Sequence, residues 1–219
     1  MGLNNFGVPK KEVEFLKKIM KLKVFVEGGT YRGDSAKNMS NKFSKVYTIE
    51  KSNTMFLEAK LNIKGIKNIN LLEGDTREHL TNILNNNNNI LFWLDAHWSG
   101  GATYGEDDEC PVLEELNIIF SYMNLTKVIL IDDARLFLSP PPKPHNFKNW
   151  PSINEISKLI PIGWGMVIYK DVIYIYPNKI EEKFKEFIQM NISNPISFTK
   201  VKVFKKFIKK TLKIMRLLR

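Results

Sequence analysis

The chain has 219 residues, of which 43% are hydrophobic and 26% are charged, as is typical of one soluble domain with a sizeable core. Its one cysteine, Cys110, excludes an internal disulfide framework and fits a reducing compartment. The net charge of +10 is concentrated at one end, because residues 200–219 carry nine basic and no acidic side chains, which leaves about +1 for the rest. We therefore expect no nucleic-acid partner at the body of the protein.

Apolar periodicity predicts alternating helices and strands over the first 94 residues. An amphipathic helix with lysines between its apolar positions comes first, and each strand is a short apolar run followed by polar residues. Five consecutive asparagines at 85–89 are expected to form a polar connection. The helices are expected at 9–22, 35–42, 53–62 and 76–84, and the strands at 24–26, 46–49, 68–72 and 90–94.

The second half continues this alternation and closes it with two strands around a tight Lys170-Asp171 turn. Strands that alternate with helices favour a parallel sheet covered on both faces, to which the hairpin adds an antiparallel end. We therefore predict an α/β fold with a mostly parallel sheet in residues 1–178, followed by a basic amphipathic helical tail at 179–219. The remaining elements are expected as helices at 111–123 and 153–160, strands at 127–131, 165–169 and 172–176, and a proline-rich loop near 140–144.

Polar residues follow the first three strands, where open α/β sheets bind their ligands. Gly28-Gly29 allows a sharp turn and a close approach to a ligand, and the next helix presents free amide groups. Glu50 is placed to accept hydrogen bonds from both hydroxyls of a ribose. Asp75 is placed to meet an adenine amino group. Each residue alone is also typical of an ordinary strand-to-helix turn, but together they predict a nucleoside site.

The same strand ends resemble a known family. Val26-Glu27-Gly28-Gly29-Thr30 with Gly33-Asp34-Ser35, then Glu50, then Gly74-Asp75, is similar to the first three motifs of class I S-adenosylmethionine-dependent methyltransferases. The resemblance covers roughly residues 20–178 and implies a Rossmann-like, doubly wound, seven-stranded fold. It also implies S-adenosylmethionine as the cofactor, with Glu27 and Gly29 at its methionine part, Glu50 at the ribose and Asp75 at the adenine. The other cofactor-binding residues expected from the resemblance are Thr30, Gly33, Ser35 and Asp95.

Further acidic residues end the fourth and fifth strands. The segment at 92–98, which contains Asp95, and Ile131-Asp132-Asp133 resemble the metal-dependent O-methyltransferases of the catechol and macrolide-sugar types. Independently of that likeness, three carboxylates at adjacent strand ends repel one another unless a cation or protons intervene. An all-oxygen ligand set favours magnesium, calcium or manganese over zinc. We therefore predict a divalent metal, magnesium first, bound by Asp95, Asp132 and Asp133. The alternative is that Asp132 or Asp133 caps the next segment while Asp95 contacts the cofactor.

His97 is the predicted general base, acting beside Asp95. A neutral imidazole next to a metal-bound hydroxyl can take its proton as the methyl group arrives. A structural role is the alternative, as it is for most single histidines. The acidic loop at 99–111 and the segment at 140–150, with Phe147 and Trp150, are expected to form an acceptor pocket or a lid.

The sequence of the basic tail predicts a binding surface and no catalytic residues. From Phe204 onward, apolar residues share one helical face and lysines the other, which is typical of a peripheral anchor on an anionic membrane. Docking on the body or on a second subunit is the alternative, so a homodimer stays open. No apolar run is long enough to cross a membrane, and residues 1–9 lack a signal-like core, so we expect a cytoplasmic protein, at most peripheral on the inner face of the membrane.

The sequence thus predicts a metal-assisted O-methyltransferase that acts on a sugar or a nucleotide-linked polar metabolite. A surface-glycan precursor, as in capsule biosynthesis, would suit a membrane-associated tail. Two alternatives remain. A nicotinamide-dependent oxidoreductase shares the glycine turn and the strand-end acid, although its usual G-x-G-x-x-G is absent. A non-catalytic S-adenosylmethionine-binding or membrane-associated scaffold would make the acidic cluster coincidental.

Overall fold

The computed structural model describes residues 7–98 and 108–193. The chain divides into two compact units, Met1–Glu181 and Glu182–Arg219. The first unit contains the whole sheet and every residue of the predicted site. In the second unit, the described residues belong to α8 (Glu181–Ser193). The predicted basic helix of residues 204–219 lies outside the described residues.

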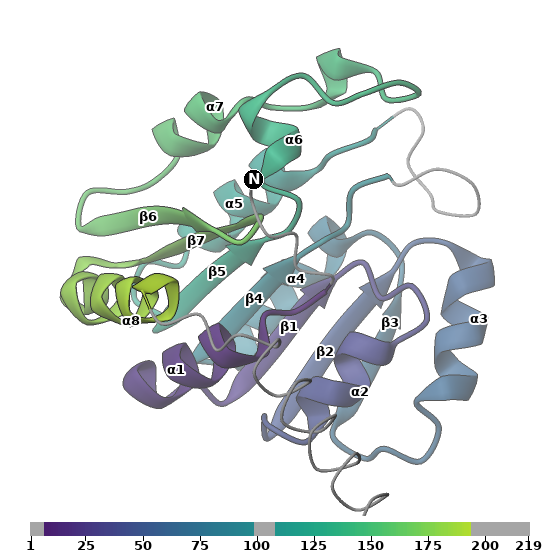
Figure 1. Cartoon of the computed structure of the whole chain (residues 1–219). Coiled ribbons are helices and arrows are strands. Elements are labelled where there is room, and N and C mark those ends of the chain that lie inside the picture. The colour runs from purple at the N-terminus through teal and green to yellow at the C-terminus, as the bar shows by residue number, and fades with distance from the viewer. Residues whose placement is uncertain (1–6, 99–107, 194–219) are drawn as a thin grey trace, which may run out of the picture. The chain divides into compact units, whose positions relative to one another are not determined.

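The first unit is built around a seven-stranded sheet with the strand order β3-β2-β1-β4-β5-β7-β6 (Figure 1). The first five strands pair in parallel, whereas β7 runs antiparallel to both β5 and β6. The prediction of a mostly parallel, Rossmann-like sheet that ends in an antiparallel hairpin is therefore confirmed. The strands are β1 (Val24–Gly28), β2 (Lys45–Glu50), β3 (Ile69–Glu73), β4 (Ile90–Leu94), β5 (Lys127–Ile131), β6 (Trp164–Tyr169) and β7 (Val172–Pro177).

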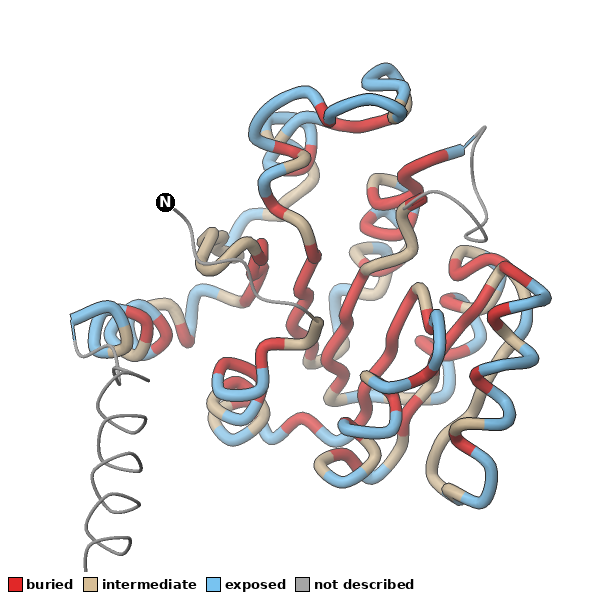
Figure 2. The backbone as a smooth tube through the Cα atoms, turned by 45° about the vertical axis from the view of Figure 1, so that its right-hand side comes forward, coloured by how far each residue is buried: buried red, intermediate tan, exposed pale blue. Residues whose placement is uncertain are grey.

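The centre of the sheet forms the core. Every residue of β1, β4 and β5 is buried, because helices cover both faces of these strands (Figure 2). In Figure 1, α1 and α2 lie in front of the sheet, and α4 and α5 lie behind it. The helices are α1 (Lys10–Met20), α2 (Asp34–Ser40), α3 (Asn53–Asn62), α4 (Thr76–Asn86), α5 (Val112–Phe120), α6 (Arg135–Leu138) and α7 (Ile153–Lys158), with 3-10 turns at Phe147–Asn149 and Asn178–Ile180.

Most differences from the predicted elements lie at their ends. The first helix stops at Met20 because Lys21 adopts a left-handed conformation and its N–H binds the Lys17 carbonyl. The helix α4 runs to Asn86, into the asparagine run that was expected to be a connection. The four-residue α6 was not predicted, since it is too short for a periodic pattern. Among the described residues, no helix is long and apolar enough to cross a membrane.

Candidate active site

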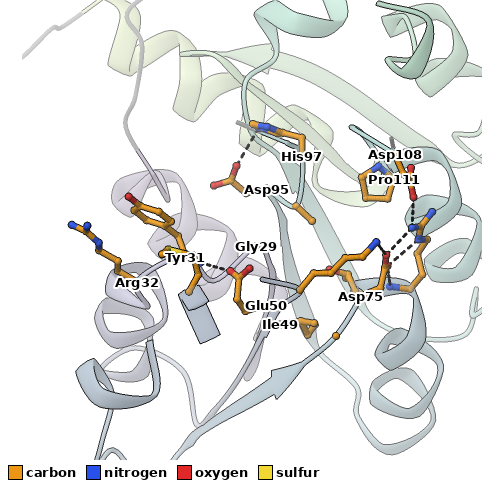
Figure 3. A pocket seen from close by; sticks show the side chains of 16 residues that line it. Gly29, Tyr31, Arg32, Ile49, Glu50, Asp75, Asp95, His97, Asp108 and Pro111 are labelled. Atoms are coloured by element: carbon orange, nitrogen blue, oxygen red, sulfur yellow. Dashed lines mark hydrogen bonds and ion pairs between the residues drawn. The ribbon is translucent and has the colours of Figure 1, made fainter. Parts of the chain in front are cut away.

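A cavity of about 510 Å³ opens at the carboxyl ends of β1 to β4 (Figure 3). Gly29, Glu50, Asp75 and Asp95, which follow or end these four strands, all line it, and so does His97. The cavity is therefore at the sheet edge where the sequence places the nucleoside site. Its position agrees with the general rule for ligand sites of open α/β sheets.

The turn after β1 packs directly against the end of β4. Gly29 has a φ of +85°, and a Cβ atom at this position would lie 2.3 Å from the backbone oxygen of Asp95. Two hydrogen bonds fix the turn, from the N–H groups of Gly29 and Thr30 to the carbonyl oxygen of Ile49. A residue without a side chain is therefore required where β1 meets the cavity.

Glu50 ends β2 with a carboxylate that the backbone holds in place. Its Oε2 accepts a hydrogen bond from the Tyr31 N–H at 2.7 Å, and its Oε1 accepts one from the Ser52 N–H at 2.8 Å. Burial raises the pKa of Glu50, and these N–H donors oppose that rise. Figure 3 shows the carboxylate between Tyr31 and the cavity. Because the carboxylate is held on both oxygens, it is preorganised to receive ligand hydroxyls.

Four of the predicted cofactor residues do not line the cavity. Glu27 is 1% exposed, and its Oε2 accepts a hydrogen bond from the Thr48 hydroxyl, which also contacts the Thr30 hydroxyl. Burial, with the charges of Asp95 and Glu50, raises the pKa of Glu27 to about 8. The other two residues belong to α2, where Gly33 caps the helix with a φ of +80° and Ser35 lies in the first turn. The structure thus places Glu27, Thr30, Gly33 and Ser35 in the scaffold around the turn.

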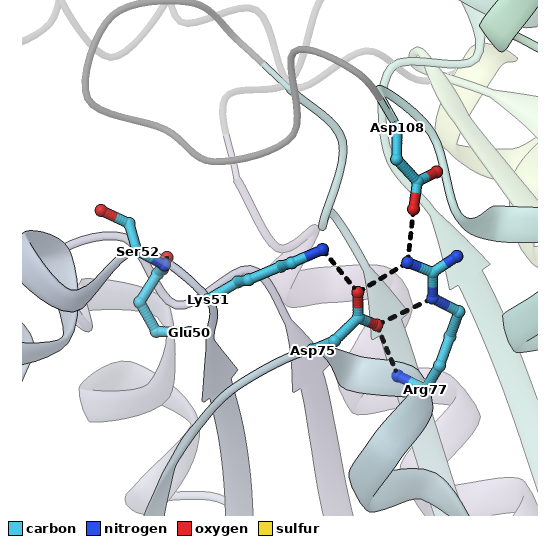
Figure 4. Close-up of polar contacts among 6 residues, drawn as sticks. All are labelled: Glu50, Lys51, Ser52, Asp75, Arg77 and Asp108. Atoms are coloured by element: carbon cyan, nitrogen blue, oxygen red, sulfur yellow. Dashed lines mark hydrogen bonds and ion pairs between the residues drawn. The ribbon is translucent and has the colours of Figure 1, made fainter.

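Asp75 lines the cavity, but its carboxylate is already fully engaged (Figure 4). Its Oδ1 accepts hydrogen bonds from the backbone N–H and the Nε of Arg77, both at 2.9 Å. Its Oδ2 accepts from the Arg77 Nη2 at 2.6 Å and from the Lys51 Nζ at 2.9 Å. Although burial opposes the charge, these donors hold the pKa of Asp75 well below its usual range.

The two basic partners of Asp75 were not among the predicted site residues. Lys51 directly follows Glu50, and Arg77 lies two residues after Asp75, so their only sequence signal is a basic residue beside each predicted acid. Arg77 also pairs with Asp108, at the start of the segment that leads into α5. This end of the cavity therefore presents paired charges rather than a single unpaired carboxylate.

At the other end, the structure brings together all four of the predicted catalytic and metal-binding residues. The Nε2 of His97 lies 3.2 Å from the Oδ1 of Asp95 and 3.5 Å from the Oδ2 of Asp133. Burial disfavours a charged imidazole, but the close Asp95 carboxylate and the charges of Asp133 and Asp132 raise the pKa of His97. Burial, together with the charges of Asp95 and Asp133, raises the pKa of Asp132 to about 8. The cluster is thus an excess of acid around one buried imidazole.

The donor chemistry of this cluster fits a hard divalent cation. Asp95, Asp132 and Asp133 provide carboxylate oxygens at adjacent strand ends, and magnesium, calcium and manganese prefer such ligands. In the chain as described (7–98 and 108–193), no three acidic, histidine or cysteine side chains already surround one metal position. The cation therefore stays a prediction.

A buried carboxylate supports the wall beside His97. Glu109 is 2% exposed and accepts hydrogen bonds from the Trp150 indole N–H at 2.6 Å and the Asn146 N–H at 2.8 Å. The Trp150 ring lies 5.3 Å from the His97 ring, so the segment at 140–150 contributes Trp150 to this region as an indole that is itself nearly buried. Phe147, the other aromatic expected there, is 59% exposed.

Sequence reasoning did not single out Glu109, because it ends an acidic run that was predicted only as part of an acceptor pocket or a lid. Its partners His145, Asn146 and Trp150 lie 36 to 41 residues away, and no local sequence pattern predicts such contacts. The part of that loop at 99–107, predicted as an acceptor pocket or lid, lies outside the described residues.

A second buried acid behind the cavity gives a pH-dependent prediction. Burial, with the charge of Asp75, raises the pKa of Glu115 from 4.5 to about 8. Losing the proton of Glu115 costs more in the folded protein than in the unfolded chain. The contribution of the protonated carboxyl to the free energy of unfolding is therefore fully present below the unfolded-state pKa and is lost as the pH rises through about 8. We expect Glu115→Gln to exceed the wild type in free energy of unfolding by at least about 1 kcal/mol above pH ~8, and to match it near pH ~4. Urea denaturation across this range measures the difference, and parallel curves would contradict the prediction.

Neither a protein-family model nor a curated protein sequence matches the chain. Solved structures do match it. A provisionally assigned O-methyltransferase from Klebsiella pneumoniae has a TM-score of 0.54 at 12% identity, covering 80% of this chain and 83% of its own. The O-methyltransferase from Bacillus cereus in complex with S-adenosylhomocysteine has a TM-score of 0.51 at 15% identity, covering 78% and 82%.

A third structure agrees with these two. A provisionally assigned caffeoyl-CoA O-methyltransferase from Staphylococcus aureus has a TM-score of 0.53 at 16% identity, covering 80% of this chain and 86% of its own. At sequence identities this low, the structural matches establish the fold alone. The strand order and the antiparallel end of the sheet agree with that fold. The chain has the class I methyltransferase fold, as its motifs predicted.

Proposed function

We propose that the protein is an enzyme that transfers the methyl group of S-adenosylmethionine to an oxygen of a small polar acceptor. The observation that carries the proposal is one cavity that joins a preorganised carboxylate at the end of β2, Glu50, to the cluster of His97 and Asp95. The Glu50 carboxylate can accept hydrogen bonds from the hydroxyls of a ribose, and the cluster of His97 and Asp95 can take the proton of an acceptor hydroxyl. The bound S-adenosylhomocysteine of the Bacillus cereus structure supports the choice of cofactor.

The transfer is a direct displacement at a sulfonium carbon. The acceptor oxygen forms a bond to the methyl carbon as the carbon–sulfur bond breaks, and the sulfur of S-adenosylhomocysteine keeps the electron pair. The hydroxyl proton goes to the Nδ1 of His97, which has no hydrogen-bond partner among the described residues. The Nε2 faces the Asp95 carboxylate at 3.2 Å, so it carries the N–H, and this contact orients the ring. Since His97 is nearly buried beside Trp150, the wall at this point excludes water from the base.

The finer proposal includes a divalent cation, magnesium first, held by Asp95, Asp132 and Asp133. When bound, the cation would grip acceptor oxygens and lower the pKa of the hydroxyl that is methylated. The concentration of carboxylates around Asp132 supports this assignment.

The acceptor is proposed to be a sugar or a nucleotide-linked polar metabolite, such as a surface-glycan precursor. This rests on the sequence likeness to sugar-methylating enzymes and on the basic tail at 200–219, for which we propose an anionic membrane surface. Such a protein would work in the cytoplasm, peripherally on the inner face of the membrane.

Calorimetric titration of the full chain with S-adenosylhomocysteine, with and without magnesium, tests the cofactor assignment first. We expect micromolar binding, and Glu50→Gln should weaken it by about 10-fold because a charged hydrogen bond to the ribose is lost. NADH serves as the competing ligand. Binding of NADH in place of S-adenosylhomocysteine would overturn the methyltransferase proposal, whereas binding followed by no turnover in an acceptor screen would favour a scaffold.

A further inference from the structure

The turn between β6 and β7 lies beside the acidic pair that follows β5. The strand β7 pairs antiparallel with β5, with Ile131 opposite Ile173, so the Lys170-Asp171 turn is at the carboxyl end of β5. Both turn residues adopt left-handed conformations, with φ values of 49° and 65°. The backbone oxygen of Asp171 accepts a hydrogen bond from the Ala134 N–H at 2.8 Å. A segment almost 40 residues away in sequence thereby fixes the loop after Asp133.

The carboxylate of Asp171 binds Arg135 at two points. Its Oδ1 accepts a hydrogen bond from the Arg135 backbone N–H at 2.9 Å, and its Oδ2 pairs with the Arg135 Nη1. The Asp171 side chain is 6% exposed, whereas the Arg135 side chain is 49% exposed, so the acid is the fixed partner of this pair. Arg135 is thus held at its backbone and at its guanidinium by the same acid.

Arg135 in turn binds the second acid of the pair. The same Nη1 contacts the Oδ1 of Asp133 at 2.6 Å, while the Oδ2 of Asp133 lies 3.5 Å from the Nε2 of His97. One oxygen of Asp133 is therefore fixed by Arg135, and the other is directed at the catalytic cluster. Because Arg135 binds both Asp171 and Asp133, its single positive charge is divided between the two carboxylates. Arg135 therefore orients Asp133 but only partly neutralises its charge.

We propose that Asp171 is a positioning residue that acts through Arg135 to direct the free oxygen of Asp133 toward His97 and the predicted cation. This inference rests on the proposed function of the same cluster. It assigns a role in the site to the closing hairpin, whose described residues do not line the cavity. Without Asp171, the guanidinium charge would fall on Asp133 alone and compete with a cation for it.

Manganese, which can replace magnesium and is counted by electron paramagnetic resonance, is the probe for the test. We expect Asp171→Ala to weaken Mn²⁺ binding by about 10- to 100-fold, the usual effect of losing a residue that orients a metal ligand. Asp171→Asn keeps an oxygen that accepts the Arg135 N–H but loses the negative charge. Its affinity for Mn²⁺ should lie between those of the wild type and Asp171→Ala. Lys170→Ala is the matched control, because it changes the neighbouring left-handed residue and removes contacts with Glu12 and Tyr169 rather than with Arg135. It should bind Mn²⁺ within about twofold of the wild type.

A second measurement needs no metal. The imidazole resonances of His97, assigned from the loss of signal in His97→Gln, should move in Asp171→Ala and stay in place in Lys170→Ala. If the wild type binds Mn²⁺, unchanged Mn²⁺ affinity in Asp171→Ala would overturn the positioning role. If the wild type binds no Mn²⁺, unchanged His97 resonances in Asp171→Ala would overturn it. S-adenosylhomocysteine titration separates the two proposals, because failure of the wild type to bind it refutes the proposed function and not the positioning role.

Discussion

Replacing His97 with glutamine should lower the rate of methyl transfer by about 10²- to 10⁴-fold, the usual contribution of a positioned general base. Glutamine keeps a polar side chain of similar reach but cannot take a proton at neutral pH. Since His97 contacts Asp95 and Asp133 at the acidic end of the cavity, the affinity for S-adenosylhomocysteine should stay within about twofold. Initial rates with the best acceptor of the screen, beside calorimetry, measure the two effects separately.

His79→Gln is the control for this experiment. His79 lies in α4, and its Nε2 contacts the carbonyl oxygen of Glu73 at 2.9 Å, away from the acidic cluster. Its replacement should leave the rate nearly unchanged. A His97→Gln variant as active as this control would remove His97 from the mechanism and leave proton loss to the predicted metal site or to solvent.

Replacing Gly29 with alanine should lower the free energy of unfolding by about 3 kcal/mol and weaken S-adenosylhomocysteine binding by at least about 10-fold. The new Cβ would meet the backbone oxygen of Asp95 at 2.3 Å and its carbonyl carbon at 2.8 Å, so the turn after β1 and the end of β4 must separate. Both segments line the cavity, and neither can yield as a flexible side chain would. Urea denaturation and calorimetry measure the two consequences.

Gly65→Ala provides a matched comparison. Gly65 has the same φ of +85°, but nothing lies within 4 Å of the Cβ that the substitution would add. This variant should lose about 1 kcal/mol from backbone strain and keep its affinity for the ligand. Equal losses of stability in both variants would mean that the left-handed conformation, and not the contact with Asp95, requires glycine at position 29.

The sheet could be predicted because each of its strands corresponds to a short local sequence pattern. Residues 90–94 and 128–131 are short apolar runs, as expected for parallel strands that are covered on both faces. Both runs lie in fully buried strands. Since parallel strands end at one edge, the acids that follow them were expected to meet there. Asp95, Asp132 and Asp133 do lie around His97 in the structure.

The details of the site depended on contacts that no local pattern encodes. Glu27 was expected at the ligand, but β1 runs one residue beyond it to Gly28, and its carboxyl binds Thr48 of β2 instead. Asp75 was expected as a single acceptor, but Arg77 and Lys51 occupy both of its oxygens. Residues that are 24 apart, or 41 apart as for Glu109 and Trp150, meet only through the fold.

The position of β7 has a consequence for how the protein is made. This strand is the last of the seven in the chain, yet it lies between β5 and β6, whereas β5 is complete some 40 residues earlier. A nascent chain that has not reached Val172 therefore exposes the unpaired edge of β5, a strand that is apolar after Lys127. Such edges pair readily with other chains, so we expect ribosome-bound or truncated forms that end before β7 to depend on chaperones. The acidic pair after β5 also acquires its support from Asp171 only at that late stage of synthesis.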